Sequence, residues 1–177
     1  MGPSGSGKSS LLNYICGTLP HGLEGRGRVV AGGEDLAGLP PERRRIGILF
    51  QDDLLFPHLS VGGNLAFGLP ATVKRRQVRR QKVEAALEEA GLAGFAGRDP
   101  GTLSGGQRAR VALMRTLLAA PRALLLDEPF AKLDAKLRER IRRFVFDHAA
   151  ARAQPTLLVT HDPEDARSAG GRVVELD

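Results

Sequence analysis

The first residues of the chain have the types and spacing of a loop that binds phosphate groups. The stretch GPSGSGKS, residues 2–9, has two glycines separated by four residues and followed by lysine and serine. Glycines let backbone N–H groups turn toward phosphate oxygens, and the N-terminus of a following helix adds positive potential. In such a loop Lys8 contacts the β- and γ-phosphates and the Ser9 hydroxyl group coordinates Mg²⁺. The alternative, a flexible Gly/Ser-rich terminus, does not explain the Lys-Ser pair or the helical pattern that follows.

A pair of carboxylates at the end of an apolar run is a second candidate site. Residues 123–126, Ala-Leu-Leu-Leu, are followed by Asp127, Glu128 and Pro129. In an α/β sheet, ligands bind beyond the carboxyl ends of the strands. Asp127 can hold Mg²⁺ there, and Glu128, which points the other way, can orient or deprotonate an attacking water. The alternative is that this triplet only ends a strand and begins a turn, which the phosphate loop in the same chain disfavours.

A third motif, LSGGQ at residues 103–107, precedes apolar residues at helical spacing. Ser104 is a suitable N-cap, and the two glycines leave the N–H groups of the first turn open to an anion. An isolated helix start would indicate little about function. The combination of all three motifs is highly specific.

The elements that must position these residues are predicted by hydrophobic patterning. Short apolar runs predict four strands, over residues 45–50, 123–126, 156–159 and 172–176. Apolar residues at helical spacing predict helices that include residues 11–19, ended by Pro20, residues 83–90, ended by Gly91, and residues 137–148. Residues 162–165, Asp-Pro-Glu-Asp, predict a further helix start, with an N-cap, a proline in the first turn and acidic residues after it. Because strands alternate with helices, we expect an α/β fold with a largely parallel sheet. The strand-poor stretch between about residues 52 and 103 predicts an inserted helical subdomain.

Composition and charge narrow the class of protein. The 177 residues, 42% of them hydrophobic, suffice for one sizeable hydrophobic core. This length disfavours a division into two large independent domains. A formal net charge of +6 attracts anions, but it does not distinguish nucleic acid from an anionic membrane face or a nucleotide phosphate. The one cysteine, Cys16, excludes an internal disulfide and fits a reducing compartment, and it is predicted to be a small core residue on the helix after the phosphate loop. No apolar run approaches the roughly 18 residues of a membrane-spanning helix, and no signal peptide opens the chain, so we expect a soluble intracellular protein.

Six cations fall within nine residues, in the region predicted to be helical. They are Lys74, Arg75, Arg76, Arg79, Arg80 and Lys82. A solvated surface is the simplest interpretation, and attraction to an anionic membrane face is the next. Nucleic acid binding is the third, but 5% aromatic residues and the absence of tryptophan leave little for base stacking. We therefore expect no nucleic acid partner.

Together, the motifs resemble those of the ATP-binding subunits of ABC transporters. The stretches RRRIGILFQ at residues 43–51 and GTLSGGQRAR at residues 101–110 are most similar to short bacterial importer ATPases, those of thiamine, iron(III), polyamine and sulfate-type uptake systems. The resemblance covers nearly the whole chain and implies the ABC ATPase type of P-loop NTPase fold. It implies a RecA-like nucleotide-binding core of residues 1–51 and 108–177, N-terminally incomplete, and a helical subdomain of residues 52–107 that ends in the signature motif.

The resemblance also assigns roles to individual positions. Residues 2–9 match the Walker A motif, residues 103–107 match the signature motif, and residues 124–128 match the Walker B motif. Gln51 occupies the position of the Q-loop glutamine, and His161 occupies that of the switch histidine. Residues 131–134 are similar to the D-loop, in which Lys132 is an unusual residue. The residues thereby implied to bind ATP are Gly2, Pro3, Ser4, Gly5, Ser6, Gly7, Lys8, Ser9, Ser10, Gln51, Ser104, Gly105, Gly106, Gln107 and Asp134. Those implied to act in catalysis are Glu128, His161 and Gln51, and those implied to bind Mg²⁺ are Ser9, Gln51 and Asp127.

The resemblance implies partners as well. Two copies pair head to tail, so that ATP lies between the phosphate loop of one copy and residues 104–107 of the other. Membrane permease subunits contact the apolar cluster near residues 54–59, which includes Leu54, Leu55, Phe56 and Leu59. A satellite core beneath a loop is the alternative interpretation of this cluster. A periplasmic or extracellular solute-binding protein acts indirectly, and the chain is expected to be peripheral on the cytoplasmic face of the bacterial inner (plasma) membrane.

The chain departs from the family pattern at both ends. Only Met1 precedes Gly2, where the family has a buried strand, antiparallel strands and an aromatic residue that stacks on adenine; Tyr14, which follows the loop, cannot be given that role. Because the sequence ends at Asp177, we expect the C-terminal regulatory domain of some importer ATPases to be absent. We expect the 177 residues to be an incomplete folding unit, from a misplaced start codon or a fragment.

The function expected from the resemblance is ATP hydrolysis that drives solute import through a transporter. Two alternatives stay open. One is a soluble ABC ATPase of DNA repair or translation, although such proteins typically carry large insertions or two cassettes. The other is an inactive fragment of a transporter ATPase.

Overall fold

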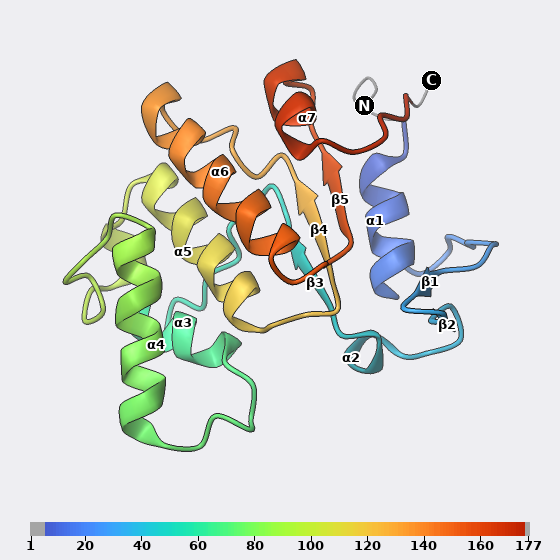
Figure 1. The fold of residues 1–177 in the computed structure, drawn as a ribbon. Helices are drawn as coiled ribbons and strands as arrows, with labels where there is room; N and C mark the ends of the chain where they lie inside the picture. Colours follow the sequence, from blue (N-terminus) through green and yellow to red (C-terminus); the bar gives the residue numbers. More distant parts are fainter. Residues whose placement is uncertain (1–5, 176–177) are drawn as a thin grey trace. The chain divides into compact units, whose positions relative to one another are not determined.

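The computed structural model describes residues 6–175, and the chain divides into two compact units (Figure 1). The first unit contains Met1–Ile48, Pro121–Glu128 and Arg142–Asp177. The second contains Leu49–Ala120 and Pro129–Ile141.

A three-stranded sheet lies in the first unit, in the order β3-β4-β5. The strands are β3 (Ile46–Leu49), whose last residue passes into the second unit, β4 (Ala123–Asp127) and β5 (Thr156–Val159). β4 and β5 run parallel, with Leu124 opposite Thr156 and Asp127 opposite Val159. Three of the four predicted strands and the α/β fold with parallel pairing are therefore confirmed.

The predicted strand over residues 172–176 is wrong for the part that the structure describes. Residues 172–175 form no strand, and Val173 and Val174 are 51% and 54% exposed. An apolar run becomes a strand only where a neighbouring strand offers a backbone ladder, and local sequence does not show whether one is present. Leu176 lies outside the described residues.

Helices and a small hairpin complete the first unit. They are α1 (Lys8–Cys16), β1 (Val30–Ala31), β2 (Glu34–Asp35), α2 (Pro41–Arg44) and α7 (Pro163–Ala169), with the second part of α6 (Ala135–Ala150). Leu12 and Cys16 from α1 pack with Leu125 of β4 and Val159 of β5 in one apolar cluster. The prediction of Cys16 as a small core residue agrees with this packing, and burial raises the pKa of its thiol to about 11.

The first helix ends earlier than the sequence pattern predicted. α1 stops at Cys16 because Gly17 adopts φ 81° and donates its N–H group to the carbonyls of Asn13 and Tyr14. The buried Arg44 guanidinium group donates to the Tyr14 and Ile15 carbonyls at 2.8 and 2.9 Å. A β-carbon at position 17 would lie 2.8 Å from that guanidinium group. Pro20 therefore follows the end of the helix and does not cause it.

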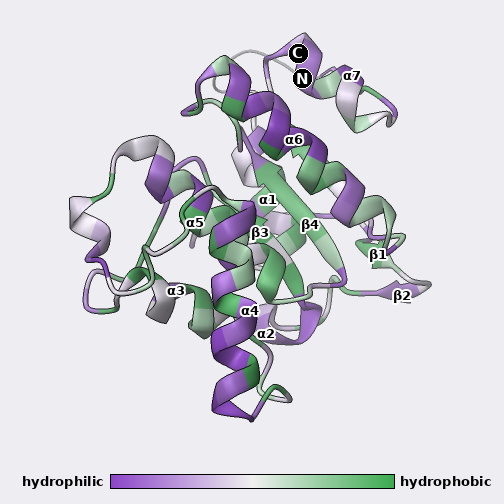
Figure 2. Cartoon of the chain, turned by 60° about the vertical axis from the view of Figure 1, so that its left-hand side comes forward, coloured by the Kyte–Doolittle hydropathy of each residue, from purple (hydrophilic) through white to green (hydrophobic). Residues whose placement is uncertain are grey.

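The second unit is helical. It contains α3 (Val61–Gly68), α4 (Arg76–Glu89), the short 3-10 helix η1 (Pro100–Thr102), α5 (Gly105–Leu118) and the start of α6. α4 buries Val83, Ala86 and Leu87 on one face, and Figure 2 shows that its other residues are mostly hydrophilic. A β-carbon at Gly68 would lie 2.3 Å from the Arg115 carbonyl oxygen, so this glycine allows α3 to approach α5 closely.

Across residues 6–175, no helix combines the length and the apolar character required to cross a membrane.

Candidate functional site

The described part of the phosphate loop leads directly into α1, as predicted. Gly7 is the N-cap, with φ 82°, a left-handed conformation that glycine adopts without strain. The Lys8 ammonium group donates to the Ser6 hydroxyl oxygen at 3.3 Å, within the loop. Gly2, Pro3, Ser4 and Gly5 lie outside the described residues. The start of α1 thus places Lys8 and Ser9 at the positive end of a helix.

Ser9 and Asp127 meet although 118 residues separate them in the chain. The Ser9 hydroxyl group donates to Asp127 Oδ2 at 3.2 Å. Burial is the largest influence on the Asp127 carboxyl group and raises its pKa, while the hydrogen bond from Ser9 lowers it. A buried carboxylate beside a hydroxyl group is an oxygen donor pair of the kind that Mg²⁺ prefers. The donor set therefore fits the predicted magnesium ligands.

Glu128 and His161 meet at the carboxyl ends of neighbouring parallel strands. The Glu128 carboxylate lies 3.0 Å from His161 Nδ1. Glu128 has φ 48°, an uncommon left-handed conformation for a residue with a side chain, and its N–H group donates to the Val159 carbonyl at 2.9 Å. Backbone strain of this kind persists where the surrounding structure enforces it and is often found at active sites. The register of β4 and β5 thus brings together two residues that the sequence predicted separately.

A buried polar cluster supports the turn that carries His161. Asp165 accepts a hydrogen bond from Thr160 Oγ1 at 3.2 Å and from the Arg142 guanidinium group of α6 at 3.1 Å. The Thr160 hydroxyl oxygen also accepts from the Asp162 N–H group at 3.0 Å. Asp162 caps α7 through the Glu164 N–H group, with Pro163 in the first turn, as predicted. The cluster therefore fixes the residues on both sides of His161.

Sequence reasoning missed Arg142 and Asp165. In the sequence each is one charged residue among many on a helix, and 23 residues separate them. The only available signal was local: Asp165 lies four residues after His161, in the first turn of a helix whose start was recognised.

Asp165→Asn should lower the free energy of unfolding by about 1–3 kcal/mol, because it removes the buried anion 3.1 Å from Arg142 and leaves only the more exposed Glu164 carboxylate, 3.6 Å away. Urea denaturation followed by circular dichroism measures the change. The matched control is Asp147→Asn on α6, whose carboxylate is exposed and should contribute about 0–1 kcal/mol. Equal effects of the two substitutions would contradict a structural role for the buried pair.

In the second unit, Ser104 and Gln107 form a reciprocal cap at the start of α5. The Ser104 hydroxyl oxygen accepts from the Gln107 N–H group at 3.3 Å, and Gln107 Oε1 accepts from the Ser104 N–H group at 2.9 Å. The predicted N-cap is confirmed. Gln107, predicted to bind nucleotide, has its side-chain oxygen engaged in this cap. Nothing lies within 3.8 Å of a β-carbon built at Gly105, so this first turn has open space beside it.

Gln51 and Asp134 are also in the second unit. Gln51 is exposed in the segment that follows β3, and its carbonyl oxygen accepts from the Lys132 ammonium group at 2.8 Å. Asp134 Oδ1 accepts from the Leu137 N–H group at 3.0 Å and so caps the start of α6. The structure brings Lys8, Ser9, Asp127, Glu128 and His161 together in the first unit, which also contains the predicted residues Ser6, Gly7 and Ser10. The second unit contains the remaining predicted site residues that the structure describes, Gln51, Ser104, Gly105, Gly106, Gln107 and Asp134.

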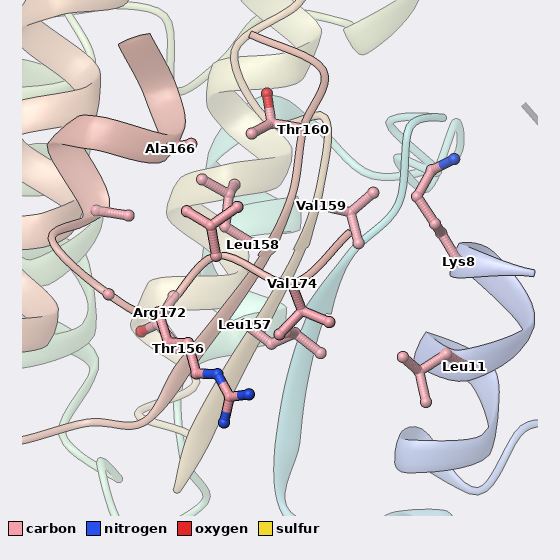
Figure 3. A pocket seen from close by; sticks show the side chains of 13 residues that line it. Lys8, Leu11, Thr156, Leu157, Leu158, Val159, Thr160, Ala166, Arg172 and Val174 are labelled. Carbon is pink, nitrogen blue, oxygen red and sulfur yellow. The ribbon is translucent and has the colours of Figure 1, made fainter. Parts of the chain in front are cut away.

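A groove of about 270 Å³ lies beside β5 in the first unit (Figure 3). Leu11 of α1, Leu157 and Val159 of β5, and Val174 line it, with Lys8 at its margin. None of the described residues that line it is aromatic, so the groove does not supply a ring for stacking on adenine. Among residues 6–175, β5 pairs with β4 alone. The expectation of an incomplete folding unit stays a prediction.

Comparison with protein families matches residues 1–131 to the family described as ABC transporter. The uncharacterized ABC transporter ATP-binding protein YnjD of Escherichia coli K12 is 52% identical, over 93% of this chain and 76% of its own length. The thiamine import ATP-binding protein ThiQ of Cereibacter sphaeroides is 45% identical, over 98% of this chain and 74% of its own length. The sulfate/thiosulfate import ATP-binding protein CysA of Mycolicibacterium paratuberculosis is 44% identical over 100% of this chain and 48% of its own length.

Comparison with solved structures supports the same family. The dimeric post-hydrolysis state of an ATP-binding cassette bound to ADP and Pi superposes with a TM-score of 0.80 at 34% identity, over 95% of this chain and 75% of that one. These matches do not favour the alternative of a non-transporter ABC ATPase. With a phosphate loop that opens α1 and paired acidic residues at the end of β4, the chain belongs to the ABC transporter family, as one of its ATP-binding ATPase subunits.

Proposed function

We propose that this ATPase subunit powers a bacterial solute importer and that it hydrolyses MgATP between two copies of the chain. The observation that carries the proposal is the meeting of Ser9 with Asp127 and of Glu128 with His161 at the carboxyl ends of β4 and β5. Relatives named as thiamine import and sulfate/thiosulfate import ATP-binding proteins support the direction of transport. The chain would act from the cytoplasmic face of the membrane, as a peripheral subunit.

Each predicted site residue named here from the first unit has a defined role in this proposal. Lys8 and the N–H groups at the start of α1 bind the phosphates, and Ser9 and Asp127 hold Mg²⁺. Bound Mg²⁺ supplies positive charge that offsets the charge developing on the phosphate oxygens. Glu128 accepts a proton from the attacking water. His161, when both ring nitrogens carry protons, donates from Nδ1 to the Glu128 carboxylate and from Nε2 toward the γ-phosphate.

The second unit supplies the residues that would act on a neighbouring copy. The capped start of α5 presents the N–H groups of Gly105 and Gly106, the first two residues of the helix, which have no acceptor within the helix; this is an anion-binding arrangement. We propose that it meets the γ-phosphate held by the phosphate loop of a second copy, with Gln51 contacting Mg²⁺ and Asp134 lying near the shared nucleotide. Dimeric cassettes among the similar solved structures support this arrangement. The proposed division into a core of residues 1–51 and 108–177 and a subdomain of residues 52–107 assigns Gln51 and Asp134 to the core and residues 104–107 to the subdomain.

A rigid apolar surface in the second unit is the proposed contact for permease subunits. Leu54 and Phe67 are 60% and 66% exposed. The Phe67 ring packs edge-on against Phe56, with ring centroids 4.6 Å apart. The buried Asn64 accepts from the Phe56 N–H group at 2.8 Å and donates to the Phe56 carbonyl at 3.1 Å, which holds this loop in place. Exposed apolar side chains on a fixed loop are typical of a protein interface.

Replacing both Leu54 and Phe67 by aspartate should reduce copurification with permease subunits by at least about tenfold, because each change puts a charge into an apolar contact. ATP hydrolysis by the isolated chain should stay within about twofold, since neither side chain belongs to the nucleotide site. Val30→Asp, at an exposed apolar position in the first unit, is the control and should leave copurification unchanged. Equal copurification of permease subunits with all variants would exclude this surface as the contact, and absence of copurification with the unsubstituted chain would contradict the proposal that the chain powers a solute importer.

A further inference from the structure

Three charged side chains meet in the second unit, from three separate segments of the chain. The Asp53 carboxylate, only 12% exposed, lies 3.4 Å from Arg108 Nε of α5 and 3.3 Å from the Lys132 ammonium group. Lys132 belongs to the turn that precedes α6. Because this carboxylate is largely shielded from water, the two contacts are screened less than those of an exposed ion pair.

Lys132 also contacts the backbone of two predicted site motifs. Its ammonium group donates to the Gln51 carbonyl oxygen at 2.8 Å. Its own carbonyl oxygen lies 2.9 Å from where a β-carbon at Gly106 would be, so only glycine fits beside this turn without a shift. One residue therefore touches the loop of Gln51 with its side chain and the start of α5 with its backbone.

A second cation restrains the same loop from α5. The Arg115 guanidinium group donates to the carbonyl oxygens of Asp53 at 3.3 Å and Leu54 at 2.9 Å. These contacts lie on the side of the loop that follows Gln51, and the Gln51 peptide itself is bonded to Lys132. Removal of the Lys132 ammonium group would therefore release Gln51 while leaving the next residues attached to α5.

We propose that Lys132 is a positioning residue for ATP hydrolysis, which links the Gln51 loop to the start of α5 through its contacts with Gln51, Asp53 and Gly106. The inference rests on the proposed function, because it gives these two motifs their roles in the reaction. Lys132 acts through the residues that it holds. A small displacement of a positioned group lowers the rate of the chemical step more than it weakens substrate binding.

The test compares Lys132→Met, which removes the charge and keeps most of the length, with Lys132→Arg, which keeps a cation that can donate to both partners. We expect kcat for ATP hydrolysis to fall about tenfold in Lys132→Met with KM changed less than about twofold, and to recover in Lys132→Arg. Lys136→Met, an exposed lysine of α6, is the matched control and should behave as the unsubstituted chain. Equal kcat values for Lys132→Met and Lys136→Met in an active enzyme would overturn the inference.

Hydrogen–deuterium exchange makes the test independent of activity. In Lys132→Met, amides of residues 51–52 and 105–108 should exchange faster, by about tenfold, because one charge-assisted hydrogen bond and one ion contact are lost. Asp53→Asn should accelerate the same segments, and the addition of Lys132→Met to it should then have a smaller effect. Unchanged exchange in these segments would overturn the inference even if the chain hydrolysed no ATP. Absent hydrolysis with the expected exchange pattern would instead contradict the proposed function.

Discussion

Glu128→Gln is expected to lower kcat for ATP hydrolysis by about 10³-fold, because it removes the carboxylate that accepts the proton of the attacking water. ATP binding should persist, since the phosphate contacts of Lys8 and the hydroxyl group of Ser9 are unchanged. The ATP-bound dimer should therefore accumulate. Phosphate release measures the first effect, and size-exclusion chromatography with and without MgATP measures the second.

The geometry around Glu128 explains why the amide should not substitute. The carboxylate lies 3.0 Å from His161 Nδ1, and a glutamine amide at that position can keep a hydrogen bond but cannot take up a proton. Glu24→Gln, at an exposed position in the same unit, removes one negative charge elsewhere and should leave kcat unchanged. Near-normal phosphate release by purified Glu128→Gln would exclude this residue as the base.

Ser104→Arg should abolish most ATP hydrolysis while each chain still binds ATP at its own phosphate loop. The arginine side chain places bulk and charge at the start of α5, where the γ-phosphate held by a second copy is proposed to lie. We expect the rate to fall by about 10²-fold or more, because the open N–H groups of this turn act as donors to the developing charge. ATP titration and steady-state hydrolysis, measured on the same samples, separate the two effects.

Loss of the helix cap must be distinguished from loss of the shared site. Ser104→Ala removes the hydroxyl oxygen that accepts from Gln107 and should cost about 1 kcal/mol of stability without adding bulk. Ser104→Asn keeps an N-cap acceptor, so it isolates the effect of side-chain size. If an isolated monomer hydrolyses ATP at the rate of the dimer, with or without these changes, the composite site is wrong.

Local chemistry determined the ends of several elements before the structure was known. A helix start depends on the few residues that cap it, and Ser104 with Gln107 and Asp162 with Pro163 form caps where the sequence predicted them. The same is true of the buried strand β4, because its first four residues are apolar and all five of its residues are buried. Gly17 was the missed local signal, since a glycine after a helical run commonly ends it.

Tertiary structure alone decided which side chains meet. The Ser9 contact with Asp127 and the Glu128 contact with His161 depend on the register of β4 with β5 and on the packing of α1, and hydrophobic patterning sets neither.

The dependence of side-chain contacts on tertiary structure also explains which sequence predictions were wrong and which contacts were missed. Residues 172–175 have a strand-like pattern but no ladder, because strand formation requires a partner strand as well as a suitable sequence. The buried Arg142 contact with Asp165 and the Lys132 contact with Asp53 join residues 23 and 79 positions apart. The composition of a motif determines what its residues can bind, whereas contacts between distant segments arise only when the folded chain excludes water from between them.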